Sequence, residues 1–302
     1  MKKPVKLLLR IAVSLGLLYF LLSSIDIGNI GGLLASASLP LLAVSMLLVA
    51  VIIAISGWRW YNLTPKGLTL KVAVDYTFIG CYFNNFLPTN FGGDGVKIHL
   101  LGKRLSSLTA AAVSVFWDRY TGLAGLVLAG AIGYVAAYHR LRDTPLTWVY
   151  PAALAALILS AALLKTNWIK RLISFLARRE FSSQGSPGRG KIFKALTASL
   201  VIQIIGSLYI YILALSLSIE VSFIDCLVFC PLANLAAVLP LSISGLGIRE
   251  GAMVYLFGLS GVPKEEALLL SLAGFAVMLI VSLWGGVVYV KRDGETKSKT
   301  TT

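Results

Sequence analysis

Long apolar segments follow one another along this chain, with short polar segments between them. Eight are long enough to be buried as helices, at about 5–24, 39–58, 72–88, 108–138, 146–164, 194–217, 223–240 and 265–290. Two shorter apolar pieces lie at 93–104 and 247–259. A twelve-residue helix reaches only about 18 Å, whereas the hydrocarbon core of a membrane is about 30 Å thick. The short pieces must therefore stop inside the membrane or pair with the apolar run before them.

The composition indicates the same class. Hydrophobic residues make up 57% of the 302 residues, charged residues only 13%, and the mean hydropathy is +0.84. A water-soluble core cannot absorb that much apolar surface, so the sequence predicts an all-α integral membrane protein, a polytopic helical bundle. Lys2 and Lys3 precede the first apolar run as in a signal peptide, but no convincing cleavage site follows, and we interpret this run as an uncleaved first helix.

The basic residues decide how these segments cross, because cytoplasmic loops carry most of them. The segment 165–194 alone holds eight: Lys165, Lys170, Arg171, Arg178, Arg179, Arg189, Lys191 and Lys194. If this segment is cytoplasmic, residues 72–104 enter from the cytoplasm and return there as a re-entrant hairpin, while residues 223–259 enter and leave from the exterior. Both chain ends are then cytoplasmic. In this arrangement 21 basic residues lie in cytoplasmic segments, three outside and three within the membrane.

The net charge of +14 has a simple explanation in this topology. Basic cytoplasmic loops attract anionic membrane lipids, so the charge does not indicate nucleic-acid binding. We therefore expect a multi-pass protein of the cell (plasma) membrane. Residues 178–190 are predicted to be a flexible cytoplasmic linker, and residues 291–302 a disordered cytoplasmic tail.

Two stretches that lie 152 positions apart read almost alike: Pro88-x-x-x-Gly92-Gly93-x-Gly95-Val96-Lys97 and Pro240-x-x-x-Ser244-Gly245-x-Gly247-Ile248-Arg249. They predict one transmembrane domain, 1–302, built from two repeats at 5–138 and 146–290. Each repeat has three full crossings and one re-entrant helical hairpin, about six crossings and two hairpins in all. Because three is odd, the second repeat is inverted, and the two glycine-rich tips approach the midplane from opposite faces.

Other residues suit packing within a membrane. Small residues let helices approach closely, and we expect this of Gly122, Gly125, Gly130, Gly133, Gly274, Gly285 and Gly286. An interfacial aromatic belt is expected from Trp58, Trp60, Trp148 and Tyr150. Cys226 and Cys230 share a helix face, but without further ligands they predict neither a metal site nor a disulfide.

Six ionisable residues fall deep in the predicted membrane region, and their charges sum to zero: Asp94, Lys97, Asp118, Arg119, Arg249 and Glu250. Each charge there costs about 2.5–3.5 kcal/mol, so these side chains must pair, line water or meet a ligand. They could simply neutralise one another as a buried network that fixes the hairpins. A binding site explains in addition the glycine-rich tips, which packing does not require.

The binding interpretation follows from the chemistry of these groups. The glycines leave free N–H groups at the starts of the short helices, which attract anions. Arg119 and Arg249, with Lys97, suit a phosphate, because arginine can grip it with two parallel hydrogen bonds. The carboxylates could balance these cations, receive an amine, or couple transport to a proton gradient. The headgroup of a phospholipid or a polyprenyl phosphate fits such a site.

Three motifs resemble the signature of the lysylphosphatidylglycerol synthase transmembrane-region family, a flippase-like domain: Asn84-Asn85-x-x-Pro88-x-x-x-Gly92-Gly93-Asp94-x-x-Lys97, Asp118-Arg119-x-x-Gly122-Leu123 and Gly245-x-Gly247-x-Arg249-Glu250-Gly251. Their order and spacing match over nearly the whole chain. The resemblance implies a lipid-translocating domain, found alone or joined to an aminoacyl transferase that makes lysyl-phosphatidylglycerol. This chain lacks that transferase and resembles the stand-alone members.

The sequence therefore predicts a flippase or transporter for an anionic or aminoacylated lipid, and neither an enzyme nor a protein that needs a cofactor or metal. The expected partners are a lipid with a phosphate-containing headgroup, anionic lipids at the basic loops and a partner enzyme that makes the lipid. The expected substrate-binding residues are Asn85, Gly92, Gly93, Asp94, Lys97, Asp118, Arg119, Gly245, Gly247, Arg249 and Glu250. Two alternatives stay open: a membrane transferase with Asp94, Asp118 or Glu250 as general base, and a scaffold for lipid-modifying enzymes.

Overall fold

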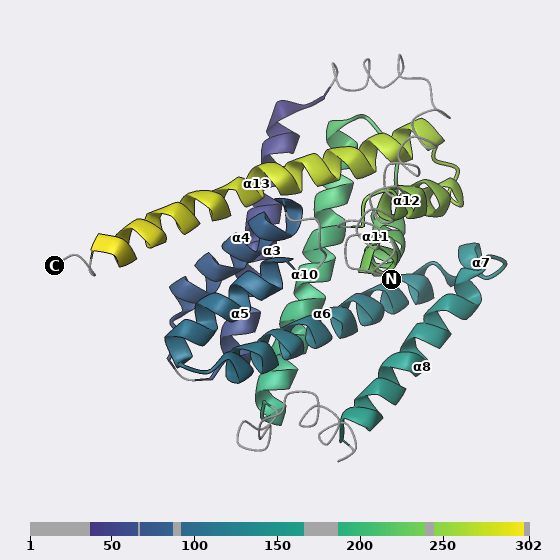
Figure 1. The fold of residues 1–302 in the computed structure, drawn as a ribbon. Helices are drawn as coiled ribbons and strands as arrows, with labels where there is room; N and C mark the ends of the chain where they lie inside the picture. Colours follow the sequence, from purple (N-terminus) through teal and green to yellow (C-terminus); the bar gives the residue numbers. More distant parts are fainter. Residues whose placement is uncertain (1–36, 66, 87–91, 166–186, 239–244, 299–302) are drawn as a thin grey trace, which may run out of the picture.

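Every regular element in the computed structural model is a helix, within the residues that it describes: 37–65, 67–86, 92–165, 187–238 and 245–298 (Figure 1). The helices are α3 (Leu39–Leu63), α4 (Leu70–Phe86), α5 (Gly92–Leu105), α6 (Leu108–Ala136), α7 (Tyr138–Leu141), α8 (Leu146–Lys165), α10 (Arg189–Ser216), α11 (Phe223–Val238), α12 (Ile248–Gly258) and α13 (Lys264–Ser298). The predicted all-α class is confirmed for this part of the chain.

Five of these helices are long and apolar enough to cross a membrane: α3, α6, α8, α10 and α13. They coincide with five of the six predicted crossings. The sixth, at 5–24, lies outside the described residues, as does most of the predicted linker at 178–190, whose last two residues begin α10. The four shorter helices α4, α5, α11 and α12 fall where the sequence predicts the two hairpins.

The last helix is longer than the sequence predicts. α13 is helical as far as Ser298, through much of the segment 291–302 that is predicted to be a disordered tail. Within this stretch Arg292 donates a 2.5 Å hydrogen bond to Asp75 of α4 and lies 5.4 Å from the ring centroid of Tyr76. This ion pair ties the end of α13 to the start of α4.

Helices that are far apart in sequence pack side by side. α10 lies along α3, α13 along α4 and α11 along α6, while α5 packs between α4 and α6. α8 lies at the edge of the bundle beside α6 (Figure 1). Many large apolar side chains are exposed on the outside, for example Leu47, Val135 and Ile158, which are 63%, 74% and 69% exposed. Such a surface suits contact with lipid rather than water.

Glycines let these helices approach closely. A Cβ added at any of the seven predicted packing glycines would lie within 4 Å of another helix, which confirms that prediction. Gly122 would meet α3, Gly125 and Gly274 would meet α10, Gly130 would meet α8, Gly133 would meet α11, and Gly285 and Gly286 would meet α4. Lipid supplies no hydrophobic force between helices, so close contact between backbones is a main source of their association.

The predicted aromatic belt is only half right. Trp58 and Trp148 are exposed, at 38% and 78%, as the prediction requires. Trp60 and Tyr150 are instead buried within the protein, where Trp60 donates a 3.2 Å hydrogen bond to Ser114 and Tyr150 donates one of 2.5 Å to the Val228 carbonyl. A buried Trp or Tyr needs such a polar partner, and only the packed helices supply it.

We expect Gly93→Ala to destabilise the protein by about 1–3 kcal/mol, because the new Cβ would overlap the Gly80 carbonyl of α4 and force α5 outward. Thermal unfolding of the purified protein in detergent measures this. Gly95→Ala, two residues further on α5, is the matched control, since its Cβ would meet no atom within 4 Å. Equal unfolding temperatures for the two variants would contradict the close approach of α4 and α5.

Candidate functional site

The first glycine-rich segment lies at the start of α5, which packs antiparallel to α4. The Gly93 N–H donates a 2.8 Å hydrogen bond to the side-chain oxygen of Asn84, so the start of α5 is held against the end of α4. At the other end, Arg104 Nε donates to the Gly67 carbonyl at 3.0 Å. Pro88 lies outside the described residues.

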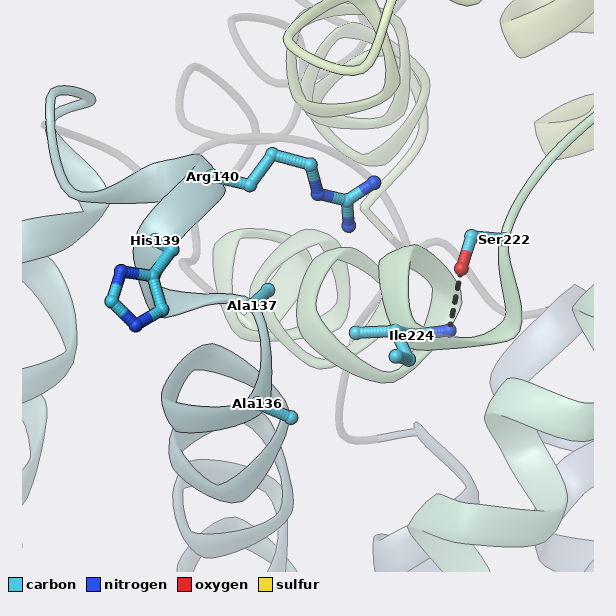
Figure 2. Close-up of a pocket in the computed structure, with 6 residues that line it drawn as sticks. All are labelled: Ala136, Ala137, His139, Arg140, Ser222 and Ile224. Carbon is cyan, nitrogen blue, oxygen red and sulfur yellow. Dashed lines mark hydrogen bonds between the residues drawn. The ribbon is translucent and has the colours of Figure 1, made fainter.

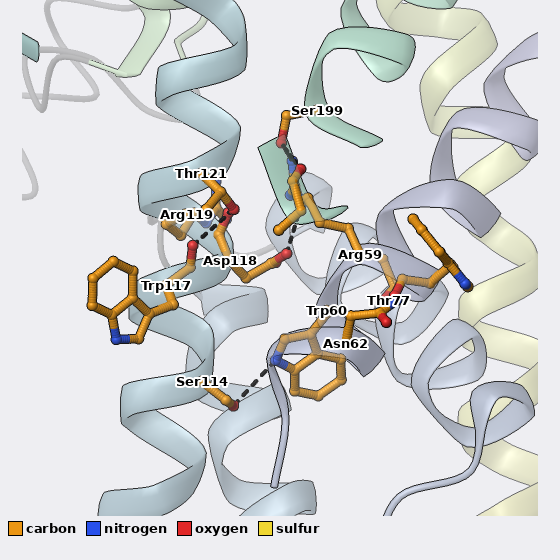
Figure 3. A network of polar contacts seen from close by, with 12 residues as sticks. Arg59, Trp60, Asn62, Thr77, Ser114, Trp117, Asp118, Arg119, Thr121 and Ser199 are labelled. Carbon is orange, nitrogen blue, oxygen red and sulfur yellow. Dashed lines mark hydrogen bonds and ion pairs between the residues drawn. The ribbon is translucent and has the colours of Figure 1, made fainter. Parts of the chain in front are cut away.

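Asp118 of α6 lies between two cations from different helices. Its Oδ1 accepts a 2.8 Å hydrogen bond from Arg59 Nε of α3, and its Oδ2 accepts one of 3.2 Å from Lys97 Nζ of α5. Arg59 also donates to Ser199 of α10 at 3.0 Å (Figure 3). One buried carboxylate and its partners therefore connect α3, α5, α6 and α10.

Lys97 has a second partner in this cluster. Its Nζ lies 4.1 Å from the ring centroid of Trp60, which Figure 3 shows beside Ser114. The side chains of Lys97 and Asp118 are only 6% and 8% exposed. Buried charges of this kind are tolerated only when they are paired and hydrogen-bonded.

The next pair lies beside this one but is more open. Arg119, adjacent to Asp118 on α6, donates from Nε and Nη2 to the two carboxylate oxygens of Asp94 at 2.7 and 3.0 Å. This is the parallel geometry that arginine forms with carboxylates and phosphates. The Arg119 side chain is 48% exposed whereas that of Asp94 is 11% exposed, so the arginine faces open space.

The second glycine-rich tip precedes α12. Gly245 and Gly247 have φ angles of +77° and +85°, a region that favours glycine. Glu250, fully buried, accepts a 2.6 Å hydrogen bond from the Gly247 N–H and one of 2.8 Å from Arg249 Nη2. The carboxylate thus holds both the turn and the arginine. The guanidinium of Arg249 also lies 4.9 Å from the ring centroid of Phe275 on α13.

The predicted residues thus form two clusters, one at α5 and α6 and one at α12, rather than a single group. α13 connects them: Asn85, near the end of α4, donates a 2.9 Å hydrogen bond to Ser282, while Arg249 lies over Phe275. Ser282 and Phe275 are seven residues apart, which is close to two helical turns or about 10 Å on the same face. Gly92 and Gly95 lie in the first turn of α5.

Arg59 is the site residue that the sequence analysis missed. It ends the apolar run at 39–58, beside two tryptophans, so it was counted among the cytoplasmic basic residues. The structure continues α3 to Leu63 and buries Arg59 against Asp118, with 10% of its side chain exposed. The count of six deep charges that sum to zero is therefore wrong, since a seventh, positive, belongs with them. The length of α3, 25 residues, is the signal that could have revealed it.

The sequence model of the lysylphosphatidylglycerol synthase TM region family matches residues 7–286. The chain belongs to this family. It is a multi-pass membrane protein, with the match covering nearly the whole chain. Two relatives, both called UPF0104 membrane protein and both from Methanothermobacter thermautotrophicus, are similar over most of their length. One is 22% identical, covering 85% of each chain, and the other 25% identical, covering 81% of this chain and 79% of its own.

A cavity of about 200 Å³ lies away from both clusters of this family member, where α6 and α7 meet the start of α11. Figure 2 shows Arg140 reaching across it from α7. Arg140 donates to both carboxylate oxygens of Asp225 on α11, so its charge is already paired. The cavity contains none of the predicted site residues.

In the described ranges, no group of three or more His, Cys, Asp or Glu side chains is placed to hold a metal ion. Cys226 and Cys230 are both buried on α11, and neither forms a disulfide.

We expect Asp118→Asn to destabilise the protein by about 3–5 kcal/mol, because it leaves two buried cations facing a neutral amide. Chemical unfolding in detergent measures this. Asp143→Asn is the matched control, because its side chain is 91% exposed and its loss of charge is screened by solvent. If the two substitutions cost the same, Asp118 does not hold the cluster together.

Proposed function

We propose that this protein is a flippase that moves a lipid with an anionic, phosphate-containing headgroup across the cell membrane. One observation carries the proposal: each of the three deep carboxylates is already bonded to a cation, whereas the arginines keep donors to spare. Asp118 holds Arg59 and Lys97, Asp94 holds Arg119, and Glu250 holds Arg249. The unused hydrogen-bonding capacity of the site is therefore that of cations, which suits an anion.

The two arginines supply the free donors. Arg119 uses Nε and Nη2 on Asp94, and its Nη1 has no partner among the residues that the structure describes. Arg249 donates from Nη2 to Glu250, its other guanidinium donors have no hydrogen-bond partner in the described part of the chain, and 21% of its side chain is exposed. An ionised phosphate oxygen can accept charge-assisted hydrogen bonds from such groups, which are roughly twice as strong as neutral ones.

The pairing of the carboxylates also favours one class of substrate and one class of function. An aminoacylated headgroup carries an ammonium group, which would need a free carboxylate, and a transferase would need one as its general base. Asp94, Asp118 and Glu250 are each engaged by arginine or lysine, which favours an anionic lipid over an aminoacylated one. The same engagement favours a transporter over an enzyme.

The arrangement of helices supports two inverted repeats with two re-entrant hairpins. The order long, short, short, long occurs twice, in α3 to α6 and in α10 to α13. The longest of the four short helices, α4, has 17 residues and so spans about 26 Å, less than the hydrocarbon core. In the proposed topology both termini are cytoplasmic, the basic loops contact anionic lipids, and a partner enzyme makes the transported lipid.

Lipid exchange in proteoliposomes tests the proposal. Vesicles would carry labelled phosphatidylglycerol, lysyl-phosphatidylglycerol or polyprenyl phosphate, and the rate of leaflet exchange would be measured. We expect exchange of an anionic lipid that falls at least about tenfold in Arg249→Ala, because the phosphate loses a charged donor. Arg249→Lys keeps the charge but not the two-donor grip and should give an intermediate rate.

Arg142→Ala is the control for these variants, because Arg142 is 58% exposed and lies in neither cluster. Its rate should equal that of the unsubstituted protein. Folded protein that exchanges none of the three lipids would refute the transport proposal and favour a scaffold. Conversion of a lipid to a product of different mass would favour the transferase.

A further inference from the structure

The cluster around Asp118 carries an excess of positive charge. Among its described members, three cations, Arg59, Lys97 and Arg119, face two carboxylates, Asp94 and Asp118. Among the residues that the structure describes, one positive charge of this cluster therefore has no carboxylate to neutralise it. The cluster at α12 differs, because Arg249 and Glu250 balance each other one to one.

Arg59 is one of the two cations that share Asp118, and its hydrogen bonds hold it in place. Its Nε and Nη1 donate to Asp118 and Ser199, and its side chain is 10% exposed. The guanidinium lies directly against Gly122, where a Cβ would be only 3.0 Å from Nη1. A glycine one helical turn after Asp118 thus leaves the space that Arg59 fills.

A network that served only to hold helices together would gain nothing from this third cation. An uncompensated buried charge costs free energy, and apolar side chains of similar volume stabilise such contacts at least as well. The excess is better explained if a negative charge from outside the protein completes the cluster. The bound ligand would then neutralise what the fold leaves positive.

The described part of the cluster has one exposed side chain, that of Arg119, at which a ligand could bind. Arg119 follows Asp118 directly on α6, and Lys97 lies three residues, or about one turn, after Asp94 on α5. Arg119 is the open member of the cluster, with 48% of its side chain exposed. The buried cations therefore act on a headgroup at Arg119 through a medium of low dielectric, where charge interactions reach further than in water.

We propose that Arg59 determines headgroup selectivity: it sets the net charge of the cluster to +1, so that the site selects a phosphodiester headgroup with one negative charge over a zwitterionic headgroup. This inference rests on the proposed lipid transport and adds the charge of the substrate to it. Arg59 acts through the cluster and is a positioning residue, because its own donors are engaged by Asp118 and Ser199.

The test compares two labelled lipids in the same proteoliposomes, phosphatidylglycerol with one negative charge and phosphatidylethanolamine with none. The quantity measured is the ratio of their exchange rates, which a general loss of fold or activity does not change. Removing one unit of charge from the cluster should lower this ratio about tenfold in Arg59→Gln, which is the effect expected of one charge acting over a distance on the order of 10 Å. Arg59→Lys keeps the charge and should keep the ratio, even if its rates fall.

A double variant separates charge from the individual contact. Arg59→Gln with Asp118→Asn removes one charge of each sign, so the cluster returns to +1 and the ratio should return with it. If Arg59→Gln does not fold, Lys97→Gln removes the same unit of charge and should lower the ratio likewise. The ratio is read only for variants that elute as monodisperse protein.

The outcomes for the two proposals are distinct. An Arg59→Gln protein that exchanges both lipids more slowly, with an unchanged ratio, overturns the charge inference and leaves transport intact. A ratio that stays low in the double variant also overturns it. If the unsubstituted protein exchanges neither lipid nor the three lipids of the first assay, the proposed function itself fails.

Discussion

The structure depends on the cost of a charge in a medium that cannot solvate it. Asp118 is 5% exposed and would be intolerable alone, so the helices that bring Arg59 and Lys97 to it must stay where they are. Through Ser199 the same cluster extends to α10. The buried ion pairs therefore fix the relative positions of four helices in a lipid environment that supplies no hydrophobic force between them.

Glycines allow the close approach of helices that these buried charge contacts require. Charged side chains can meet across helices only if the backbones come close enough, and a single methyl group would prevent that. Gly93 admits the Gly80 carbonyl, Gly125 admits Ser199, and Gly122 leaves room for the Arg59 guanidinium. Small residues and buried charges thus work together at these three contacts, where each glycine lets a polar group of another helix come close.

The carboxylates and the cations have different tasks in this arrangement. Glu250 is fully buried and holds the Gly247 turn and Arg249 together, while Asp94 orients Arg119. The arginines are the groups that reach open space. Residues beside both glycine-rich segments contact α13: Asn85 donates a hydrogen bond to Ser282, and Arg249 lies over Phe275.

The sequence by itself determined the membrane class, the positions of the helices and six of the seven deep charged residues, which belong to two glycine-rich motifs and one Asp-Arg pair. These are local features, because they depend only on runs of apolar residues and on the residues that interrupt them. Only the tertiary structure decided which charges pair, because Arg59 lies 59 residues from Asp118 and 140 from Ser199. It also decided that Trp60 and Tyr150 are buried rather than interfacial. Burial depends on which helices become neighbours, and that is a property of the packed bundle rather than of any one segment.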